Sequence, residues 1–332
     1  MKAQQLKETL HQLTRKQLPI FIWGAPGVGK SSIVKQVAKE QGIGFIDLRL
    51  ALMDPTDLKG IPYYDPSANT ALWAQPAFLP KDGSGILFLD ELNTAAPSVQ
   101  ASAYQLILDR AIGEYKLPDG WAIVAAGNRQ KDRGATYNMA TPLANRFVHL
   151  DLEVSLDAFK TWAYANGIDL RVIAYLEYKS EDLFSFDPTQ QQHAFATPRS
   201  WEYVSQVLST KLSEQLLFET ICGAIGNECA TSFFSFIAVM DQLPDLEAIL
   251  DGSFTQSIPD DMEVYYALCS GLVSHYVAKP SQKRLENLID FTMTIHPEFA
   301  VMIIQDLQHQ GVDMEHLPSF ERWVEQFSYL LE

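Results

Sequence analysis

The sequence predicts an α/β domain with a parallel five-stranded sheet and helices on both faces, followed by a half that is entirely helical. Three observations support this prediction. Five apolar segments rich in β-branched and aromatic residues lie within residues 18–150, and helical segments separate them. These five segments are almost continuously apolar, as expected for strands covered on both faces. The strand pattern ends near Ser155, and the sequence beyond it has a helical pattern.

The predicted elements of the first half alternate along the chain. The strands are expected within LPIFIW, GFIDLRL, GILFLD, WAIVAAG and FVHLDL. The main helices between them are predicted over KSSIVKQVAKEQ and APSVQASAYQLILDR. A short amphipathic helix comes first, with Leu6, Leu10 and Leu13 on its apolar side. Strands that alternate with helices are typical of a parallel sheet.

The domain boundaries follow from the change of pattern. We predict an α/β domain at residues 1–153, a first helical part at 154–210 and a helical C-terminal extension at 211–332. Breaks at QLPD, DGSF and KPSQ divide the extension into several helices.

The composition excludes several classes of protein. The 332 residues carry a net charge of −16, which argues against non-specific coating of nucleic acid, because that binding requires lysine and arginine to neutralise phosphates. The N-terminus has no apolar signal core, and the apolar runs are too short to cross a bilayer, so we expect no membrane segment. Cys222, Cys229 and Cys269 are widely spaced, which favours a reducing, cytoplasmic location over a disulfide framework.

The segment GAPGVGKSS, residues 24–32, follows the first predicted strand and begins the next helix. It fits G-x-x-x-x-G-K-[ST], the loop of P-loop NTPases, in which backbone N–H groups surround phosphate oxygens at the positive end of a helix. Lys30 is expected to contact the outer phosphates, and the Ser31 hydroxyl to ligate Mg²⁺. A glycine-rich turn that binds nothing is the alternative. The sequence thus predicts that ATP and Mg²⁺ are bound by Gly24, Ala25, Pro26, Gly27, Val28, Gly29, Lys30, Ser31 and Ser32.

Two adjacent acids, Asp90 and Glu91, end the apolar segment ILFLD. Alone they would fit a strand that ends in solvent. Together with a phosphate loop they predict a hydrolytic site, in which Asp90 helps to hold Mg²⁺ and Glu91 activates the attacking water as general base. An acid at this place separates ATP-hydrolysing enzymes from P-loop kinases, which activate a substrate hydroxyl instead.

Asn128 ends the segment WAIVAAGN in the corresponding place on another predicted strand. A neutral amide there can orient a water molecule between Glu91 and the γ-phosphate. The alternative is an asparagine favoured by a strand-to-loop turn.

Together these segments resemble the AAA+ ATPases, whose motifs come in the order Walker A, Walker B, sensor 1, arginine finger and sensor 2. Within that superfamily the chain is similar to the MoxR-type branch. The resemblance covers about residues 18–205, and its local matches are DPTDLKGIP, FLDELNTAAPSVQ, AAGN, LANRF and ATPRSW. It implies that residues 154–210 form a helical lid. Residues 206–332 contain no motif whose function carries over, although GAIGNECATSFFSFI is similar to the C-terminal extension of some bacterial members.

The resemblance implies that Arg146 is the arginine finger, which stabilises transition-state charge on the ATP of an adjacent subunit. Such an arrangement requires a head-to-tail homo-oligomeric ring, and the family implies a hexamer. The alternative is that Arg146 pairs within its own chain, for example with Asp151 or Glu153. Two further arginines, Arg129 and Arg133, lie near sensor 1 and could share the role or replace Arg146.

The resemblance also implies that Arg199 is the sensor 2 arginine, which contacts the γ-phosphate from the lid. The alternative is a surface arginine at a helix N-terminus, because Thr197-Pro198 is a helix-start signal.

Two insertions are predicted to form hairpins. Residues 60–79 resemble the helix-2 insert of the branch, and residues 111–121 resemble the pre-sensor 1 hairpin. Both would face the pore or the upper surface of a ring and touch a partner, with Tyr63, Tyr64 and Trp73 partly exposed. The alternative is that these aromatic side chains pack locally.

The resemblance implies an ATP-hydrolysing chaperone or remodeller of a protein partner, typically one with a von Willebrand factor A domain. A second hypothesis is an AAA+ motor that acts on nucleic acid. The negative net charge of the chain argues against it, as does the presence of only one lysine, Lys116, in the second predicted hairpin. A third is a scaffold that binds ATP but hardly hydrolyses it, against which Glu91 argues.

Overall fold

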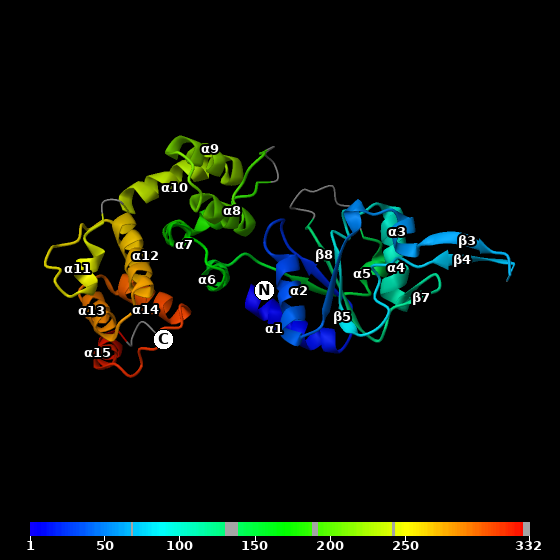
Figure 1. The fold of residues 1–332 in the computed structure, drawn as a ribbon, viewed down its shortest axis with the longest axis horizontal. Helices are drawn as coiled ribbons and strands as arrows, with labels where there is room; N and C mark the ends of the chain where they lie inside the picture. Colours follow the sequence, from blue (N-terminus) through cyan, green and yellow to red (C-terminus); the bar gives the residue numbers. More distant parts are fainter. Residues whose placement is uncertain (68, 130–138, 188–191, 241–242, 328–332) are drawn as a thin grey trace. The chain divides into compact units, whose positions relative to one another are not determined.

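The computed structural model describes residues 1–67, 69–129, 139–187, 192–240 and 243–327. Its chain forms two compact units, one that contains Met1–Ser155 and one that begins at Leu156. We call them the α/β unit and the helical unit, and each is described by itself (Figure 1).

The α/β unit is built on a five-stranded sheet in the order β2-β5-β8-β1-β9. All neighbouring strands in it are parallel. The strands are β1 (Ile20–Trp23), β2 (Gly44–Arg49), β5 (Ser84–Asp90), β8 (Gly120–Gly127) and β9 (Val148–Asp151). The predicted parallel five-stranded sheet is therefore confirmed.

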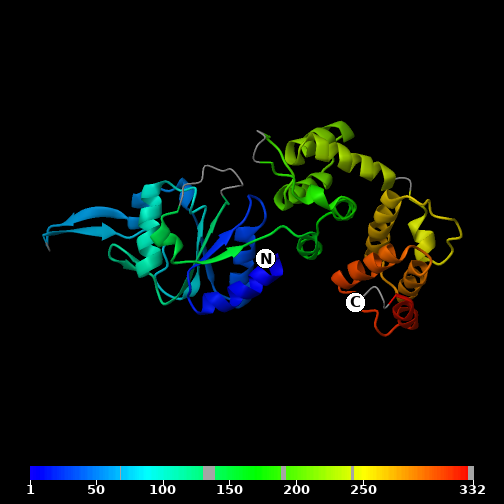
Figure 2. The same cartoon turned by 180° about the vertical axis from the view of Figure 1, so that it is seen from behind.

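Helices cover both faces of this sheet, because alternate strand side chains point to opposite faces. On one face Ile20 and Ile22 of β1 pack with Leu6 of α1 (Ala3–Arg15) and Val34 of α2 (Lys30–Gln41). On the other face Phe21 belongs to a core that the remaining helices of the unit complete. Those helices are η1 (Leu50–Leu52), α3 (Pro55–Lys59), α4 (Pro97–Asp109) and α5 (Thr141–Ala144). Figures 1 and 2 show α1 and α4 on opposite sides of the strands, so this prediction is also confirmed.

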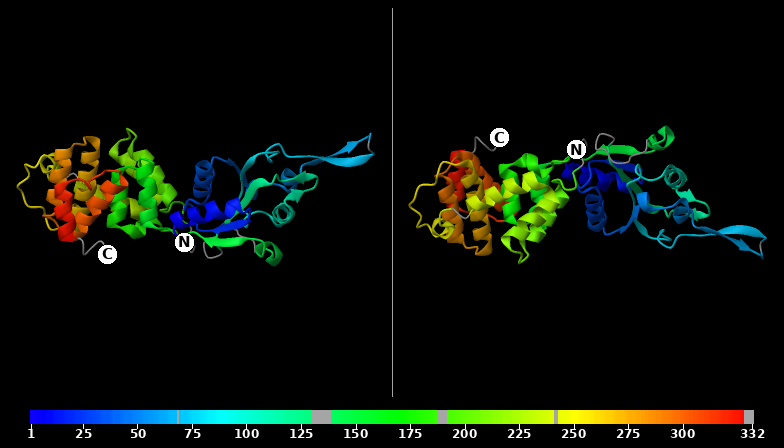
Figure 3. Two further views of the ribbon diagram at one scale, coloured as in Figure 1. Left: turned by 90° about the horizontal axis from the view of Figure 1, so that it is seen from below. Right: turned by 90° about the horizontal axis from the view of Figure 1, so that it is seen from above.

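Both predicted hairpins are present, and they differ in burial. The first pairs β3 (Ile61–Asp65) with β4 (Thr70–Ala74) and extends away from the body of the α/β unit, as Figure 3 shows. Its Tyr63 and Tyr64 are 50% and 61% exposed.

The second hairpin pairs β6 (Ala111–Ile112) with β7 (Tyr115–Lys116) and packs into the unit. The buried Tyr115 hydroxyl donates to the Pro80 carbonyl at 2.7 Å, and burial raises the pKa of Tyr115 to about 12. The aromatic side chain of this hairpin therefore packs locally, whereas those at the start of the first hairpin are exposed.

In its described ranges, the regular secondary structure of the helical unit is entirely helical. Several begin with side-chain caps, such as Asp169, Thr197 and Ser281, each of which accepts a hydrogen bond from a first-turn N–H. The helices are α6 (Leu156–Ala165), α7 (Leu170–Tyr178), η3 (Ser180–Leu183), α8 (Pro198–Leu208), α9 (Glu214–Ile225), α10 (Asn227–Met240), α11 (Leu246–Leu250), α12 (Met262–Ala278), α13 (Gln282–Thr292), α14 (Pro297–His309) and α15 (Pro318–Phe327). Across the ranges that the structure describes, none has the length and apolar character needed to span a membrane.

The helical unit contains two apolar cores. One includes Tyr175, Trp201 and Phe233, and is formed by helices α6–α10 with part of α12. The other includes Phe299 and Trp323, and is formed by helices α11–α15. Helices α9 and α10 thus share a core with α6–α8, on both sides of residue 210. The division into a lid and an extension at that residue stays a prediction.

A buried ion cluster joins helices of the helical unit that are far apart in sequence. The Lys160 ammonium of α6 donates to the Glu177 carboxylate of α7 and lies 2.9 Å from Asp306 Oδ1 of α14. Asp306 is completely buried. Burial, and then the Asp306 charge, raise the pKa of Glu177 to about 7, while Lys160 opposes the shift. One lysine therefore serves two buried acids.

Candidate functional site

The predicted site residues of the α/β unit follow the carboxyl ends of three parallel strands. The phosphate loop follows β1, Asp90 ends β5, and Asn128 comes directly after β8. Strand β8 lies between β1 and β5, which brings Asn128 between the loop and the two acids. The carboxyl edge of a parallel sheet is where ligands bind in open α/β folds. The topology therefore gathers on one edge residues that lie about a hundred positions apart.

The phosphate loop has the backbone that its glycines predict. Gly29 has φ +90° and caps the N-terminus of α2, a conformation that side-chain-bearing residues rarely adopt. The helix then begins at Lys30, so Ser31 and Ser32 lie in its first turn, where free N–H groups attract anions. A loop of this shape can hold phosphate oxygens with its backbone.

Lys30 connects the loop to sensor 1. Its ammonium donates to the carbonyls of Gly24 at 2.7 Å and Ala25 at 2.9 Å, and to Asn128 Oδ1 at 3.1 Å. The hydrogen bond to Asn128 spans 98 positions in sequence and joins two of the predicted catalytic elements directly.

Asp90 and Glu91 lie at a sharp turn of the chain. Glu91 has φ +56°, which costs energy for a residue with a side chain and occurs mostly where function requires it. The turn is held by the Glu91 N–H, which donates to Asp90 Oδ1 at 3.0 Å, and by the Thr94 hydroxyl, which donates to the Glu91 carbonyl at 2.8 Å. The Glu91 carboxylate is exposed and has no ion pair or hydrogen bond within the described ranges, so it is available to a water molecule.

A third acid lies close to this pair. Asp47 belongs to β2, the neighbour of β5 in the sheet. Partial burial, and then the charge of Asp90, raise the pKa of Asp47. The charge of Asp90 therefore acts on Asp47, while Arg49 and Lys35 oppose the shift of its pKa.

Asn93 is a site residue that our sequence analysis missed. Its side chain is 2% exposed and makes two reciprocal bonds to the backbone of Asn128. Asn93 Nδ2 donates to the Asn128 carbonyl at 2.7 Å, and the Asn128 N–H donates to Asn93 Oδ1 at 3.2 Å. A Cβ on Gly127 would lie 2.2 Å from Asn93 Oδ1, so the glycine permits this approach. The signal in the sequence was an amide two residues after the second of the two acids, Glu91.

Arg146 follows α5 and is exposed. In the described part of the chain its guanidinium makes no ion pair and no hydrogen bond. The acids proposed as alternative partners are engaged elsewhere: Asp151 lies 3.2 Å from Arg129 Nε, and Glu153 lies 3.5 Å from the N-terminal amine of Met1. Arg146 therefore pairs with neither of these acids.

The two other candidate arginines near sensor 1 differ from Arg146. Arg129 pairs with Asp151 and also donates to the Leu152 carbonyl at 2.7 Å, so it is held against β9. Arg133 lies outside the described residues.

Arg199 lies in the helical unit, in the first turn of α8, and is exposed. Thr197 caps this helix by accepting from the Ser200 N–H at 3.1 Å. Both predicted alternatives are compatible with this position, so the sensor 2 assignment stays a prediction.

The residues proposed for Mg²⁺ supply the ligands that this ion prefers. Ser31 offers a hydroxyl and Asp90 a carboxylate, both hard oxygen donors. In the part of the chain that the structure describes, no group of three or more His, Cys, Asp or Glu side chains could hold a metal ion. A site with two protein oxygens fits Mg²⁺, which usually takes its remaining ligands from phosphates and water.

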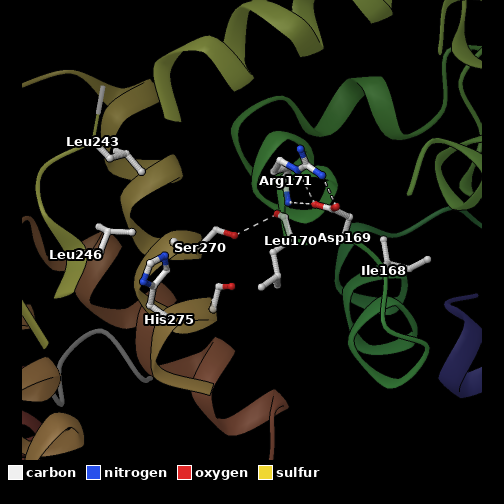
Figure 4. A pocket seen from close by; sticks show the side chains of 10 residues that line it. Ile168, Asp169, Leu170, Arg171, Leu243, Leu246, Ser270 and His275 are labelled. Atoms are coloured by element: carbon white, nitrogen blue, oxygen red, sulfur yellow. Dashed lines mark hydrogen bonds and ion pairs between the residues drawn. The ribbon is translucent and has the colours of Figure 1, made fainter. Parts of the chain in front are cut away.

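A separate cavity of about 490 Å³ lies in the helical unit between α7 and α12, shown in Figure 4. Several of its polar side chains are paired. Asp169 binds Arg171 at 2.7 Å, and Ser270 donates to the Leu170 carbonyl at 3.1 Å. None of the predicted site residues lines this cavity.

Comparison with known proteins agrees with this geometry. Residues 19–149 match the family described as "ATPase family associated with various cellular activities (AAA)". The α/β unit is an AAA+ domain. Midasin of Giardia intestinalis is 29% identical over 162 residues, which cover 46% of this chain and 3% of midasin. The MoxR protein of Methylorubrum extorquens is 24% identical over 144 residues, 42% of this chain and 40% of MoxR. The predicted resemblance to AAA+ ATPases of the MoxR type is confirmed for this part of the chain.

These matches cover less than half of the chain. The chain in turn spans well under half the length of the curated relatives. Among solved structures, NtrX from Brucella abortus is 12% identical, with a TM-score of 0.43 over 98% of this chain and 67% of that one. Similarity at this level adds nothing to the functional assignment. The activity and partners of the whole protein are therefore matters of proposal.

Proposed function

We propose that the chain hydrolyses ATP in its AAA+ domain and uses the energy to remodel a protein partner, as a MoxR-like chaperone. The observation that carries this proposal is the contact between Lys30 and Asn128, with Glu91 on the same edge of the sheet. Phosphate binding, water orientation and proton removal would thereby meet in one place.

Each residue has a distinct part in the proposed hydrolysis. The backbone of residues 24–30 and the Lys30 ammonium bind the β- and γ-phosphates. Ser31 and Asp90 hold Mg²⁺, which supplies positive charge beside the phosphates when it is bound. Asn128 orients the attacking water through its side-chain amide, and Glu91 accepts the proton of that water.

The exposed Arg146 supports an assembly in which one subunit completes the site of the next. An arginine finger contributes most when it reaches transition-state charge in a water-excluded site. We propose a head-to-tail homo-oligomeric ring, hexameric as in the family, with Arg146 acting in trans and Arg199 acting as sensor 2 from the lid.

The β3–β4 hairpin supports a protein partner. Its exposed aromatic side chains and its distance from the sheet make it accessible to another molecule. Exposed aromatic side chains are enriched at protein interfaces. The residues 61–74 carry one charged side chain, Asp65, which is poorly suited to contact phosphates. We propose a partner with a von Willebrand factor A domain, in the cytoplasm, where the three free cysteines would stay reduced.

The test compares ATP binding with phosphate release in the purified chain. Glu91→Gln should bind ATP with nearly unchanged affinity and hydrolyse it at least about 10²-fold more slowly, as expected when a general base is lost. Lys30→Ala should bind ATP poorly, and chelation of Mg²⁺ should abolish hydrolysis in the wild type. Normal turnover by Glu91→Gln would contradict the assignment.

The partner is tested with the same variant. Capture from native extract on Glu91→Gln loaded with ATP should enrich a protein that stimulates the wild-type ATPase. Tyr63→Ser with Tyr64→Ser should lose this stimulation and keep the basal rate. Stimulation by DNA and by no protein would favour the nucleic-acid motor instead.

A further inference from the structure

A hydrogen-bonded pair, Trp23 and His149, links the end of β1 to the end of α5. The Trp23 indole Nε1 lies 2.9 Å from His149 Nδ1, and the two rings are nearly parallel, with their centroids 6.0 Å apart. His149 Nε2 lies 2.8 Å from the Ala144 carbonyl. Trp23 directly precedes the phosphate loop, and Ala144 is the last residue of α5.

The chemistry of the two rings sets the direction of both bonds. An indole N–H only donates, so His149 Nδ1 must accept. The imidazole proton is then on Nε2, which donates to the Ala144 carbonyl. The link thus runs in one direction, from Trp23 through His149 to Ala144, and it uses both nitrogen atoms of the ring.

This link ends beside Arg146. The Ala144 carbonyl also accepts from the Phe147 N–H at 3.2 Å, and the Arg146 N–H donates to the Leu143 carbonyl at 3.1 Å. Leu143 and Phe147 are buried, so Arg146 lies on a short arch anchored on both sides. The arch is fixed to the sheet by the packing of Phe147 and by the His149 bond. Its exposed guanidinium has no partner in the described part of the chain that would position it otherwise.

We propose that Trp23 and His149 are positioning residues for Arg146: they hold the arch in the geometry that delivers the guanidinium to the ATP of a neighbouring subunit. This inference rests on the proposed function. It adds that the strand carrying one subunit's phosphate loop also aligns the arginine that serves the next site. Neither residue touches nucleotide in this scheme.

The first experiment separates positioning from stability. Trp23→Phe removes the indole N–H and keeps an aromatic ring in the Phe21–Phe147 cluster. We expect unchanged ATP affinity and a fall in kcat of about fivefold, the factor expected from one hydrogen bond. His149→Ala removes both bonds and should lower kcat further.

Trp121→Phe is the matched control. Its indole donates one hydrogen bond as well, but to the backbone carbonyl of Asp82 at 2.9 Å and at the opposite end of the sheet. It should lose comparable thermal stability and keep kcat. Equal effects of Trp23→Phe and Trp121→Phe on kcat would show that the Trp23–His149 link is only structural.

The second experiment locates the effect in one subunit of a pair. Arg146→Ala subunits can bind ATP but lack the finger, whereas Lys30→Ala subunits supply the finger but bind ATP poorly. Their mixture should regain activity at mixed interfaces. Adding Trp23→Phe to the Lys30→Ala subunit should lower this activity about fivefold, and adding it to the Arg146→Ala subunit should not.

The outcomes distinguish this inference from the proposed function. A loss that follows the ATP-binding subunit would show that Trp23 acts on its own phosphate loop and would overturn the inference, as would no loss in either case. If the parent mixture regains nothing although each subunit folds, the arginine finger in trans fails, and the positioning role fails with it.

Discussion

The two units of this chain differ in how certain charged side chains are paired. In the helical unit, Lys160, Glu177 and Asp306 are buried together, and the lysine forms ion pairs with both acids. In the AAA+ domain, Glu91 and Arg146 are exposed and have no partner in the described part of the chain. A charge whose partner lies in its own chain contributes to folding, whereas an exposed charge without such a partner is available to a ligand or another subunit. The presence of a partner in the same chain, more than the residue type, distinguishes a role in folding from a role in binding.

The same contrast occurs within the AAA+ domain, between two arginines near its sheet edge. Arg129 is held by Asp151 and by the Leu152 carbonyl, whereas Arg146 has no ion pair or hydrogen bond with any residue that the structure describes. Both were candidates for the finger from sequence alone. Their surroundings favour Arg146 for catalysis and assign Arg129 to the support of β9.

The largest expected effect tests this pair of arginines. Arg146→Ala should lower ATP turnover by about 10³-fold and leave ATP affinity and thermal stability nearly unchanged, because its guanidinium acts only in the assembled transition state. Arg129→Ala should instead lower the melting temperature, because it removes an ion pair and a backbone hydrogen bond. ATP turnover, ATP affinity and the melting temperature are measured for both variants and the wild type. A large loss of stability in Arg146→Ala with normal turnover would reverse the assignment.

A smaller effect is expected at Asn93, a buried side chain that serves the site indirectly. Asn93→Leu conserves volume and removes both bonds to Asn128, so the sensor 1 amide should be displaced. We expect turnover to fall by about 10²-fold, the cost of a displacement of about 1 Å in a catalytic group. The free energy of unfolding should fall by about 2 kcal/mol, because two bonds are lost.

Asn287→Leu is the matched control for Asn93→Leu. It removes a bond from a half-buried amide to the Leu250 carbonyl, at 2.9 Å in the helical unit. It should lower stability without the loss in turnover. Equal turnover losses in the two variants would show that Asn93 acts through stability alone.

The smallest effect concerns the ion cluster of the helical unit. The pKa of Glu177 is raised from 4.5 to about 7 by burial and by Asp306. The folded state therefore holds a proton that the unfolded state releases, so this group's contribution to stability falls as pH rises from about 4.5 to about 7. Glu177→Gln leaves Lys160 paired with Asp306 and should flatten this part of the pH dependence. Melting temperatures across pH 5 to 8 measure the difference, and equal slopes in both proteins would contradict it.

Local patterns in the sequence predicted much of the AAA+ domain. The strands, their coverage on both faces and the phosphate loop follow from apolar runs and from glycines at fixed spacing, because these features depend on neighbouring residues. The motif order was sufficient to predict the superfamily and its branch. For the helical unit the sequence predicted helices but not how they share two cores, since that depends on contacts such as Lys160 with Asp306.

Pairings between residues that are distant in sequence could be found only from the tertiary structure. Asn93 bonds to Asn128, 35 positions away, and Trp23 to His149, 126 positions away. No local pattern marks either pair, because a parallel sheet brings strand ends together through long crossovers. The stretch around Arg146 illustrates the contributions of both the sequence and the tertiary structure. From the sequence, the resemblance to AAA+ ATPases implied that Arg146 is the arginine finger. The tertiary structure leaves its guanidinium unpaired among the described residues, because Arg129 and the N-terminal amine already engage the nearby acids.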